Sequence, residues 1–167
     1  MEQWNETNNR VAALLDVVLL DIGGTLVVEH APMTPTNEMV PSLLENVARD
    51  LQVLSHIVRL GAATNTAVMR ESEVRALLAT VGIDEYMEVV VTSCDVGAAK
   101  PDPAVLFEAN RRLSGFDPGR ILYIGDRDTD AEAAARAGMH YKAVGPRGIL
   151  AALLDWIEEC RTDVACR

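Results

Sequence analysis

Short runs of apolar residues, rich in valine, isoleucine and leucine, alternate along the chain with longer segments whose apolar positions recur at helical spacing. The short runs predict strands over residues 17–21, 57–63, 88–92, 120–124 and 140–144. Strands that alternate with amphipathic helices are typical of a parallel sheet covered by helices on both faces. The pattern therefore predicts an α/β, doubly wound fold.

The segments between these runs predict the helices. We expect helices over residues 41–54, 74–81, 103–115, 129–137 and 150–157. Asp102 lies where it can cap the third of these helices, and Asp128 where it can cap the fourth. Gly138 follows the Ala-rich fourth helix directly and is placed to end it.

The chain has 167 residues and a hydrophobic content of 49%, which fits one compact domain with a good-sized core. We place this domain at residues 10–161, between a flexible N-terminal segment over residues 1–9 and a flexible tail over residues 162–167. The apolar stretches are only strand-sized, and no basic region leads into an apolar block near the N-terminus. We therefore expect a cytoplasmic protein without a membrane span or signal peptide.

The charge and cysteine content narrow the function classes. A formal net charge of -10 argues against nucleic acid and anionic membranes as partners, because there is no cluster of Lys and Arg to release counterions. An anionic substrate would need a local positive site. The three cysteines are widely separated and show no CxxC spacing, so a disulfide framework or a zinc site is not expected.

Polar residues follow the predicted strands where the strands end, and ligands bind at that edge of open α/β sheets. In chain order these residues are Asp21, Thr64 with Asn65, Lys100 on the loop after the third strand, and Asp126. Asp130 lies one helical turn past Asp126, so its carboxylate can point back to the same place. The sequence therefore predicts that these side chains converge.

Three converging carboxylates, those of Asp21, Asp126 and Asp130, would repel one another unless a cation lay among them. Mg²⁺ suits an all-oxygen site that also binds a phosphate oxygen. Thr64 then offers a hydroxyl donor and Lys100 a positive charge for the other phosphate oxygens. We predict that Thr64, Lys100 and the neighbouring Asn65 bind the substrate.

At this point the chain resembles the haloacid dehalogenase superfamily, whose members are mostly Mg²⁺-dependent phosphatases. The four family motifs occur in order as DIGGT from Asp21, ATNT around Thr64, KPDP from Lys100 and GDRDTD from Gly125. The resemblance covers residues 17–144 and implies a Rossmann-like sheet with helices on both faces.

The resemblance also implies roles for the matching residues. Asp21 would attack phosphorus and form an aspartyl-phosphate, which water then hydrolyses. Asp21, the backbone carbonyl of Gly23, and Asp126 would hold Mg²⁺, while Asp130 would ligate the metal or orient its waters. Thr64 and Lys100 would contact the phosphoryl group, as the residues themselves suggest.

The chain departs from the family pattern at Gly23, where the phosphatases have a second Asp that acts as general acid and then as general base. Glycine has no side chain to move a proton, and loss of such catalysis typically costs about 10² to 10⁴ in rate. Glu29 and His30 are candidates for a substitute, because they lie on the excursion after the first strand. The simpler interpretation, which we favour here, is that they form an exposed polar loop.

Neither of the family's cap insertions is expected. Residues 26–40 leave room only for a loop, and residues 65–99 are filled by one helix, one strand and the lysine loop. A site without a cap domain is open. It would accept a phosphorylated small molecule or a larger phosphorylated substrate, or it would be closed by a neighbouring subunit of a homo-oligomer.

The sequence thus predicts a Mg²⁺-dependent hydrolase, a phosphatase acting on a phosphate ester or phosphoanhydride through Asp21. The alternative is a catalytically impaired scaffold that binds Mg²⁺ and a phosphorylated ligand or partner, with Gly23 as the mark of lost turnover. A phospho-receiver domain also places Asp, Thr and Lys around Mg²⁺. Receivers, however, have their acidic pair before the phosphorylated Asp, whereas Asp126 and Asp130 come last here.

Overall fold

A computed structural model describes residues 2–29 and 39–162 of the chain. Its centre is a five-stranded sheet in the order β3-β2-β1-β4-β5, and every neighbouring pair of strands is parallel. The strands are β1 (Val17–Leu20), β2 (Arg59–Thr64), β3 (Val89–Thr92), β4 (Ile121–Gly125) and β5 (His140–Ala143). Each predicted strand is confirmed to within two residues at either end.

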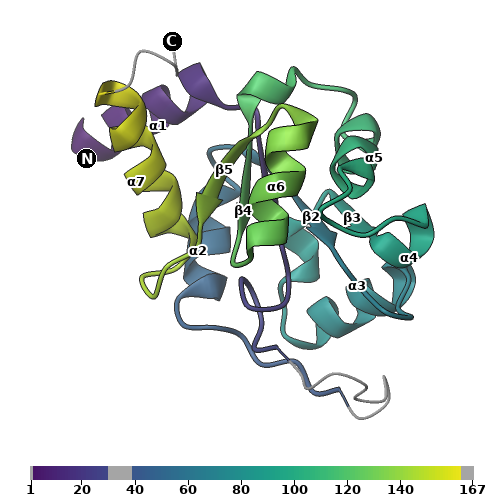
Figure 1. Cartoon of the computed structure of the whole chain (residues 1–167). Helices are drawn as coiled ribbons and strands as arrows, with labels where there is room; N and C mark the ends of the chain where they lie inside the picture. Colours follow the sequence, from purple (N-terminus) through teal and green to yellow (C-terminus); the bar gives the residue numbers. More distant parts are fainter. Residues whose placement is uncertain (1, 30–38, 163–167) are drawn as a thin grey trace.

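Helices lie on both faces of this sheet (Figure 1). They are α1 (Glu2–Leu14), α2 (Val47–Leu54), α3 (Glu71–Thr80), α4 (Ser93–Val96), α5 (Ala104–Arg112), α6 (Asp128–Ala137) and α7 (Ile149–Thr162), with short 3₁₀ turns at Asp84–Tyr86 and Pro118–Arg120. Gly138 ends α6 in the left-handed conformation, with φ of 71°, as predicted. The α/β Rossmann-like fold is thereby confirmed.

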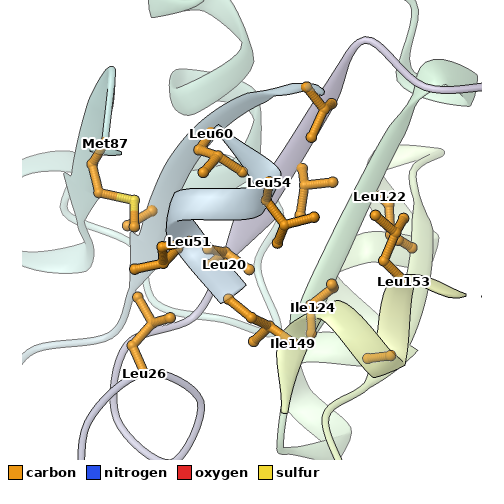
Figure 2. Packing of buried hydrophobic residues seen from close by; sticks show 14 of the residues in the cluster. Leu20, Leu26, Leu51, Leu54, Leu60, Met87, Leu122, Ile124, Ile149 and Leu153 are labelled. Carbon is orange, nitrogen blue, oxygen red and sulfur yellow. The ribbon is translucent and has the colours of Figure 1, made fainter. Parts of the chain in front are cut away.

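Alternation along β1 divides the core into two clusters. Val18 and Leu20 face one side, where the apolar residues of α1, α2, α3 and α7 pack, and Figure 2 shows leucines of α2 and α7 in this cluster. Val17 and Leu19 face the other side, where α5 and α6 pack. Because β1 is buried on both faces, its sequence is a continuous run of apolar residues. Asp21 follows directly at the carboxyl end of this strand.

The helix predicted from residue 41 begins only at Val47. Asn46, the residue before it, has a left-handed φ of 68°, which interrupts the helical backbone. Leu43 instead forms an antiparallel bridge with Val27, and the amide of Leu44 donates to the carbonyl of Leu26 at 3.0 Å. Leu43 and Leu44 are therefore apolar because they belong to a loop that packs on the core, and not because they belong to a helix.

Residues 2–9, for which we expected a flexible segment, belong to α1. Val11 and Leu15 are buried in the core, and Arg120 donates to the carbonyls of Ala12 and Ala13 at the C-terminal end of the helix. These contacts hold the end of α1 against the start of β4. In Figure 1 the helix lies beside α7. Of the expected C-terminal tail, residues 163–167 lie outside the described residues.

No helix within the described residues is long and apolar enough to span a bilayer. The described parts of the segment between β1 and α2, residues 21–29 and 39–46, contain turns and isolated bridges but no helix.

Replacement of Leu54 by alanine tests the packing of α2. Leu54 is fully buried in the cluster shown in Figure 2, so Leu54→Ala leaves a cavity and is expected to lower the free energy of unfolding by about 2–5 kcal/mol. Urea unfolding measures the change. The control is Val68→Ala, because Val68 is 68% exposed and should cost less than about 0.5 kcal/mol. Equal losses for both variants would contradict the core assignment.

Candidate active site

The parallel register brings the carboxyl ends of β1, β2 and β4 to one edge of the sheet. The amide of Asp21 donates to the carbonyl of Ile124 at 2.9 Å, so Asp21 leaves β1 beside the end of β4. A pocket of about 60 Å³ opens at this edge. It is lined by Asp21, Gly23, Glu29, Thr64, Asn65, Lys100, Arg127, Thr129 and Asp130. Six of the seven predicted site residues therefore line a single pocket, and Asp126 lies next to it.

Lys100 is the centre of this arrangement, although it is only 6% exposed. Its Nζ lies 2.8 Å from Oδ1 of Asp21 and 2.6 Å from Oδ1 of Asp130. The same ammonium donates to the hydroxyl of Tyr123 at 2.5 Å and to the carbonyl of Ala63 at 3.3 Å. A buried charge is tolerated only when it is paired and hydrogen-bonded in this way. The lysine thus joins two carboxylates from different elements, one at the end of β1 and one in the first turn of α6.

Tyr123 is a site residue that was not predicted from the sequence. It is fully buried on β4, and its hydroxyl donates to the carbonyl of Ala63 at 2.7 Å. Burial, followed by the charges of Asp21 and Asp130, raises the pKa of this phenol well above its usual value, so it remains neutral. The available signal was a hydroxyl on an otherwise aliphatic strand, since a buried hydroxyl needs a partner.

Asn65 holds the backbone of Lys100. The amide of Lys100 donates to Oδ1 of Asn65 at 2.9 Å, and Nδ2 of Asn65 donates to the carbonyl of Lys100 at 3.1 Å. These two bonds tie the lysine loop to the end of β2. The amide group of Asn65 is thus already engaged, and its contact with substrate stays a prediction. Thr64, directly before it, is buried at the end of β2.

Asp130 closes the loop between β4 and α6. Its Oδ2 accepts from the backbone amides of Asp126 and Arg127, each at 3.1 Å. The cap of α6 that we expected from Asp128 therefore comes from Asp130, which lies in the first turn and points back over the loop. A Cβ at Gly125 would lie 2.4 Å from Oδ2 of Asp130, so the close approach requires glycine there.

Asp21, Asp126 and Asp130 can each offer one oxygen to a common point, because these atoms lie within 4.8 Å of one another. Mg²⁺ takes oxygen ligands at about 2.0–2.1 Å and usually keeps several waters. The oxygens are thus close enough for one such ion if one carboxylate acts through a water. Asp130 suits that indirect role, since its two oxygens already accept from Lys100 and from two backbone amides. The donor set fits magnesium.

The electrostatics of the cluster favour a cation. Burial raises the pKa of Asp21, and the nearby charge of Asp130 adds to this, while Lys100 opposes it. Burial and the charge of Asp130 likewise raise the pKa of Asp126. In both cases the surroundings disfavour the ionised carboxylate that a metal would stabilise.

The two glycines after Asp21 have different surroundings. Gly24 has a φ of 76°, and a Cβ there would lie 2.2 Å from Oδ2 of Asp126. A Cβ at Gly23 would meet only Cγ of Glu29, at 3.9 Å, which is an ordinary contact. Gly24 is therefore required by the position of Asp126, whereas Gly23 has room for a side chain.

Glu29 is exposed, as the loop interpretation expects, but it also lines the pocket. Its carboxylate forms an ion pair with Arg127, which comes from the loop after β4. Glu29 thus returns from the excursion after β1 to the side of the pocket where Gly23 lies. His30, the other candidate named from the sequence, lies outside the described residues.

Comparison with known proteins places this site in context. A family model described as haloacid dehalogenase-like hydrolase matches residues 33–144. A glyceraldehyde 3-phosphate phosphatase of Methanopyrus kandleri is 34% identical over 112 residues, which are 66% of this chain and 43% of that protein. A plasmid-encoded phosphoglycolate phosphatase of Cupriavidus necator is 31% identical over 139 residues, which are 77% of this chain and 58% of that protein. The chain spans about half the length of these curated relatives.

Solved structures share the fold. A HAD-superfamily hydrolase of Ehrlichia chaffeensis superposes with a TM-score of 0.68 at 14% identity, over 87% of this chain and 97% of that one. One from Geobacter sulfurreducens gives 0.64 at 18% identity, over 78% of this chain and 89% of that one. The match to the family model begins at residue 33, so Asp21 and Gly23 lie before it.

Asp21→Asn tests whether the surroundings disfavour the ionised form of Asp21, the charge imbalance of the pocket. Because the pKa of Asp21 is raised on folding, the stabilisation from this group is present at low pH, when the carboxyl is protonated, and is lost as the pH rises through the folded pKa. At pH 7 with chelator present, the neutral asparagine should therefore raise the melting temperature. Asp128→Asn, which removes an exposed carboxylate from the same edge, should leave it unchanged. A lower melting temperature for Asp21→Asn would contradict the imbalance.

The two glycines form a matched pair for metal binding. Gly24→Ala should displace the carboxylate of Asp126 and weaken Mg²⁺ binding by about 10–100-fold, while Gly23→Ala should leave the affinity close to that of the unaltered chain. Isothermal titration calorimetry with MgCl₂ measures both. Equal affinity in the two variants would show that Asp126 takes no part in binding.

Proposed function

We propose that this chain, which belongs to the haloacid dehalogenase-like hydrolases, is a Mg²⁺-dependent phosphatase with Asp21 as its nucleophile. The observation that carries the proposal is the cluster in which Lys100 contacts Asp21 and Asp130 at the carboxyl edge of the sheet, with Asp126 beside them. Two of the relatives reported above are named as phosphatases, of glyceraldehyde 3-phosphate and of phosphoglycolate, which supports the same class of reaction.

The residues predicted to act on the substrate then have distinct chemical tasks. An oxygen of Asp21 attacks phosphorus while the bond to the leaving-group oxygen breaks, and water later attacks the aspartyl-phosphate to release inorganic phosphate and free Asp21. Lys100 orients Asp21 through Oδ1 and offsets charge on the phosphoryl oxygens. Thr64 supplies a hydroxyl donor to the same oxygens. Asn65 acts as a positioning residue, because its amide group holds the backbone of Lys100.

Asp21, the backbone carbonyl of Gly23, and Asp126 would hold the magnesium ion, with Asp130 orienting a water on it. When bound, the ion neutralises negative charge on the phosphoryl group and on the carboxylates. The support for this assignment is the donor set described above and the raised pKa values of Asp21 and Asp126.

A second pocket suggests which part of a substrate lies next to the phosphate. It has a volume of about 100 Å³ and shares Thr64 and Asn65 with the first pocket. Its remaining lining is almost entirely apolar, including Ile22, Val27 and Leu77. We infer that the substrate is a phosphate ester whose organic group is small and apolar. A second anionic group on the substrate would find no cation among the described residues that line this pocket.

Hydrolysis of p-nitrophenyl phosphate by the purified chain tests the proposal. The aryl group fits an apolar pocket, and its phenolate leaves with little need of a proton, so activity should survive the glycine at position 23. We expect turnover that requires MgCl₂, falls to the rate of buffer in Asp21→Asn, and exceeds turnover of 2-phosphoglycolate at equal concentration. Asp128→Asn serves as the active control.

Activity that persists in Asp21→Asn or in chelator would overturn the proposed mechanism. If the chain binds Mg²⁺ and the phosphate mimic fluoroberyllate but releases no product, the impaired scaffold becomes the better account of the site.

A further inference from the structure

We propose that Glu29 performs the proton transfer for which Gly23 has no side chain. The inference rests on the phosphatase function proposed above and assigns one further catalytic residue to the same site. Its basis is the position of Glu29, whose side chain occupies the space beside Gly23 and lines the pocket that also holds Asp21 and Lys100.

The geometry places the two residues together directly. A Cβ built on Gly23 would lie 3.9 Å from Cγ of Glu29, which is van der Waals contact. The Glu29 side chain therefore runs past the point at which a side chain at position 23 would begin. Its carboxylate pairs with Arg127, the residue that directly follows Asp126. Glu29 thus approaches the carboxylate cluster from the side opened by the glycine.

The backbone before Glu29 is well anchored, so this approach is built into the fold. The carbonyl of Ile22 accepts from the amides of Thr25, Leu26 and Val27, which makes a compact turn directly after Asp21. The amide of Gly24 donates to the carbonyl of Val27 at 2.8 Å.

One residue further on, the amide of Val28 donates to the carbonyl of Ser42, also at 2.8 Å. These bonds return the chain to the pocket at Glu29. They also join the turn to the segment that leads into α2.

Arg127 completes the arrangement. Its ion pair with Glu29 joins the excursion after β1 to the loop after β4 and holds the glutamate side chain at the pocket. A carboxylate is the form that can act as a base. In the second half of the reaction water must lose a proton as it attacks, and an ionised Glu29 can accept that proton.

In that half-reaction the Glu29 carboxylate takes a proton from water while the water oxygen bonds to phosphorus and the bond between phosphorus and Asp21 breaks. The products are inorganic phosphate, free Asp21 and protonated Glu29. In the first half-reaction of the next cycle, the same proton passes to the leaving-group oxygen as its bond to phosphorus breaks. One carboxyl thus serves both steps, and the proton is conserved over the cycle.

Glu29→Gln tests this role in single-turnover and steady-state assays with p-nitrophenyl phosphate and MgCl₂. Because this leaving group departs without a proton, the first step should survive, while the attack of water should slow by about 10² to 10⁴. We expect a burst of one p-nitrophenolate per active site, then slow turnover, and a phosphorylated protein detectable by mass spectrometry. Glu132→Gln, which removes an exposed carboxylate from α6, should show neither burst nor slowing.

A rescue variant separates proton transfer from a structural role. Gly23 has no positive φ and has room for a side chain, so Gly23→Asp in the Glu29→Gln background should restore steady turnover and abolish the burst. Arg127→Met breaks the ion pair while keeping the glutamate, and should give no burst. If Glu29 served only to hold Arg127, Arg127→Met would reproduce the defect of Glu29→Gln and Gly23→Asp would not repair it.

The outcomes distinguish this inference from the proposed function. Wild-type turnover in Glu29→Gln, without a burst, would overturn the assignment of Glu29 while leaving Asp21 as the nucleophile. Absence of Mg²⁺-dependent activity in the unaltered chain would instead overturn the phosphatase proposal itself.

Discussion

The ammonium of Lys100, buried between two carboxylates, is the interaction on which the candidate site depends. Asp21 and Asp130 arrive from β1 and α6, and each would carry a desolvated charge without it. Placing the ammonium requires three further residues from β2 and β4: Asn65 after β2 holds the lysine backbone, while the hydroxyl of Tyr123 on β4 and the carbonyl of Ala63 on β2 accept from Nζ. The parallel sheet thus brings four segments of the chain within hydrogen-bond distance of Nζ of Lys100: the end of β1, β2, β4 and the first turn of α6.

Charge at this edge explains why a metal and a phosphate belong together there. Among the described residues, the pocket lining together with Asp126 contains four carboxylates, those of Asp21, Asp126, Asp130 and Glu29, against the cations of Lys100 and Arg127. Two negative charges are left over, so a phosphate dianion would be repelled unless a divalent cation entered first or with it. The repulsion among these carboxylates is stronger than the net charge of -10 alone would indicate, because several of the groups are buried and less screened by water.

Features that depend on residues near one another in the sequence could be predicted from it. Features that depend on contacts between distant elements could not. Strand runs and the residues at their ends follow from burial and chain direction, so the sheet and the convergence of Asp21, Lys100 and Asp130 could be predicted. The start of α2 could not, because the leucines at positions 43 and 44 are apolar in a packed loop as they would be in a helix. Tyr123 and the cap supplied by Asp130 depend on partners from other elements, and single-residue patterns do not show such partners.

The position of the proton-transfer group has a structural consequence for the enzyme class. A carboxylate two residues after the nucleophile is held in place by the same turn that holds the nucleophile. Glu29 instead reaches the pocket through a longer loop. The last described hydrogen bond before Glu29 in this loop runs from the amide of Val28 to the carbonyl of Ser42. A group held by an ion pair between two exposed side chains is less constrained than one held by a buried network, because such pairs contribute little energy in water. The alignment of Glu29 therefore depends on occupants of the pocket more than the alignment of Asp21 does. A substrate whose organic group fills the adjoining apolar pocket packs against Val27, two residues before Glu29, and so links recognition of the substrate to placement of the base.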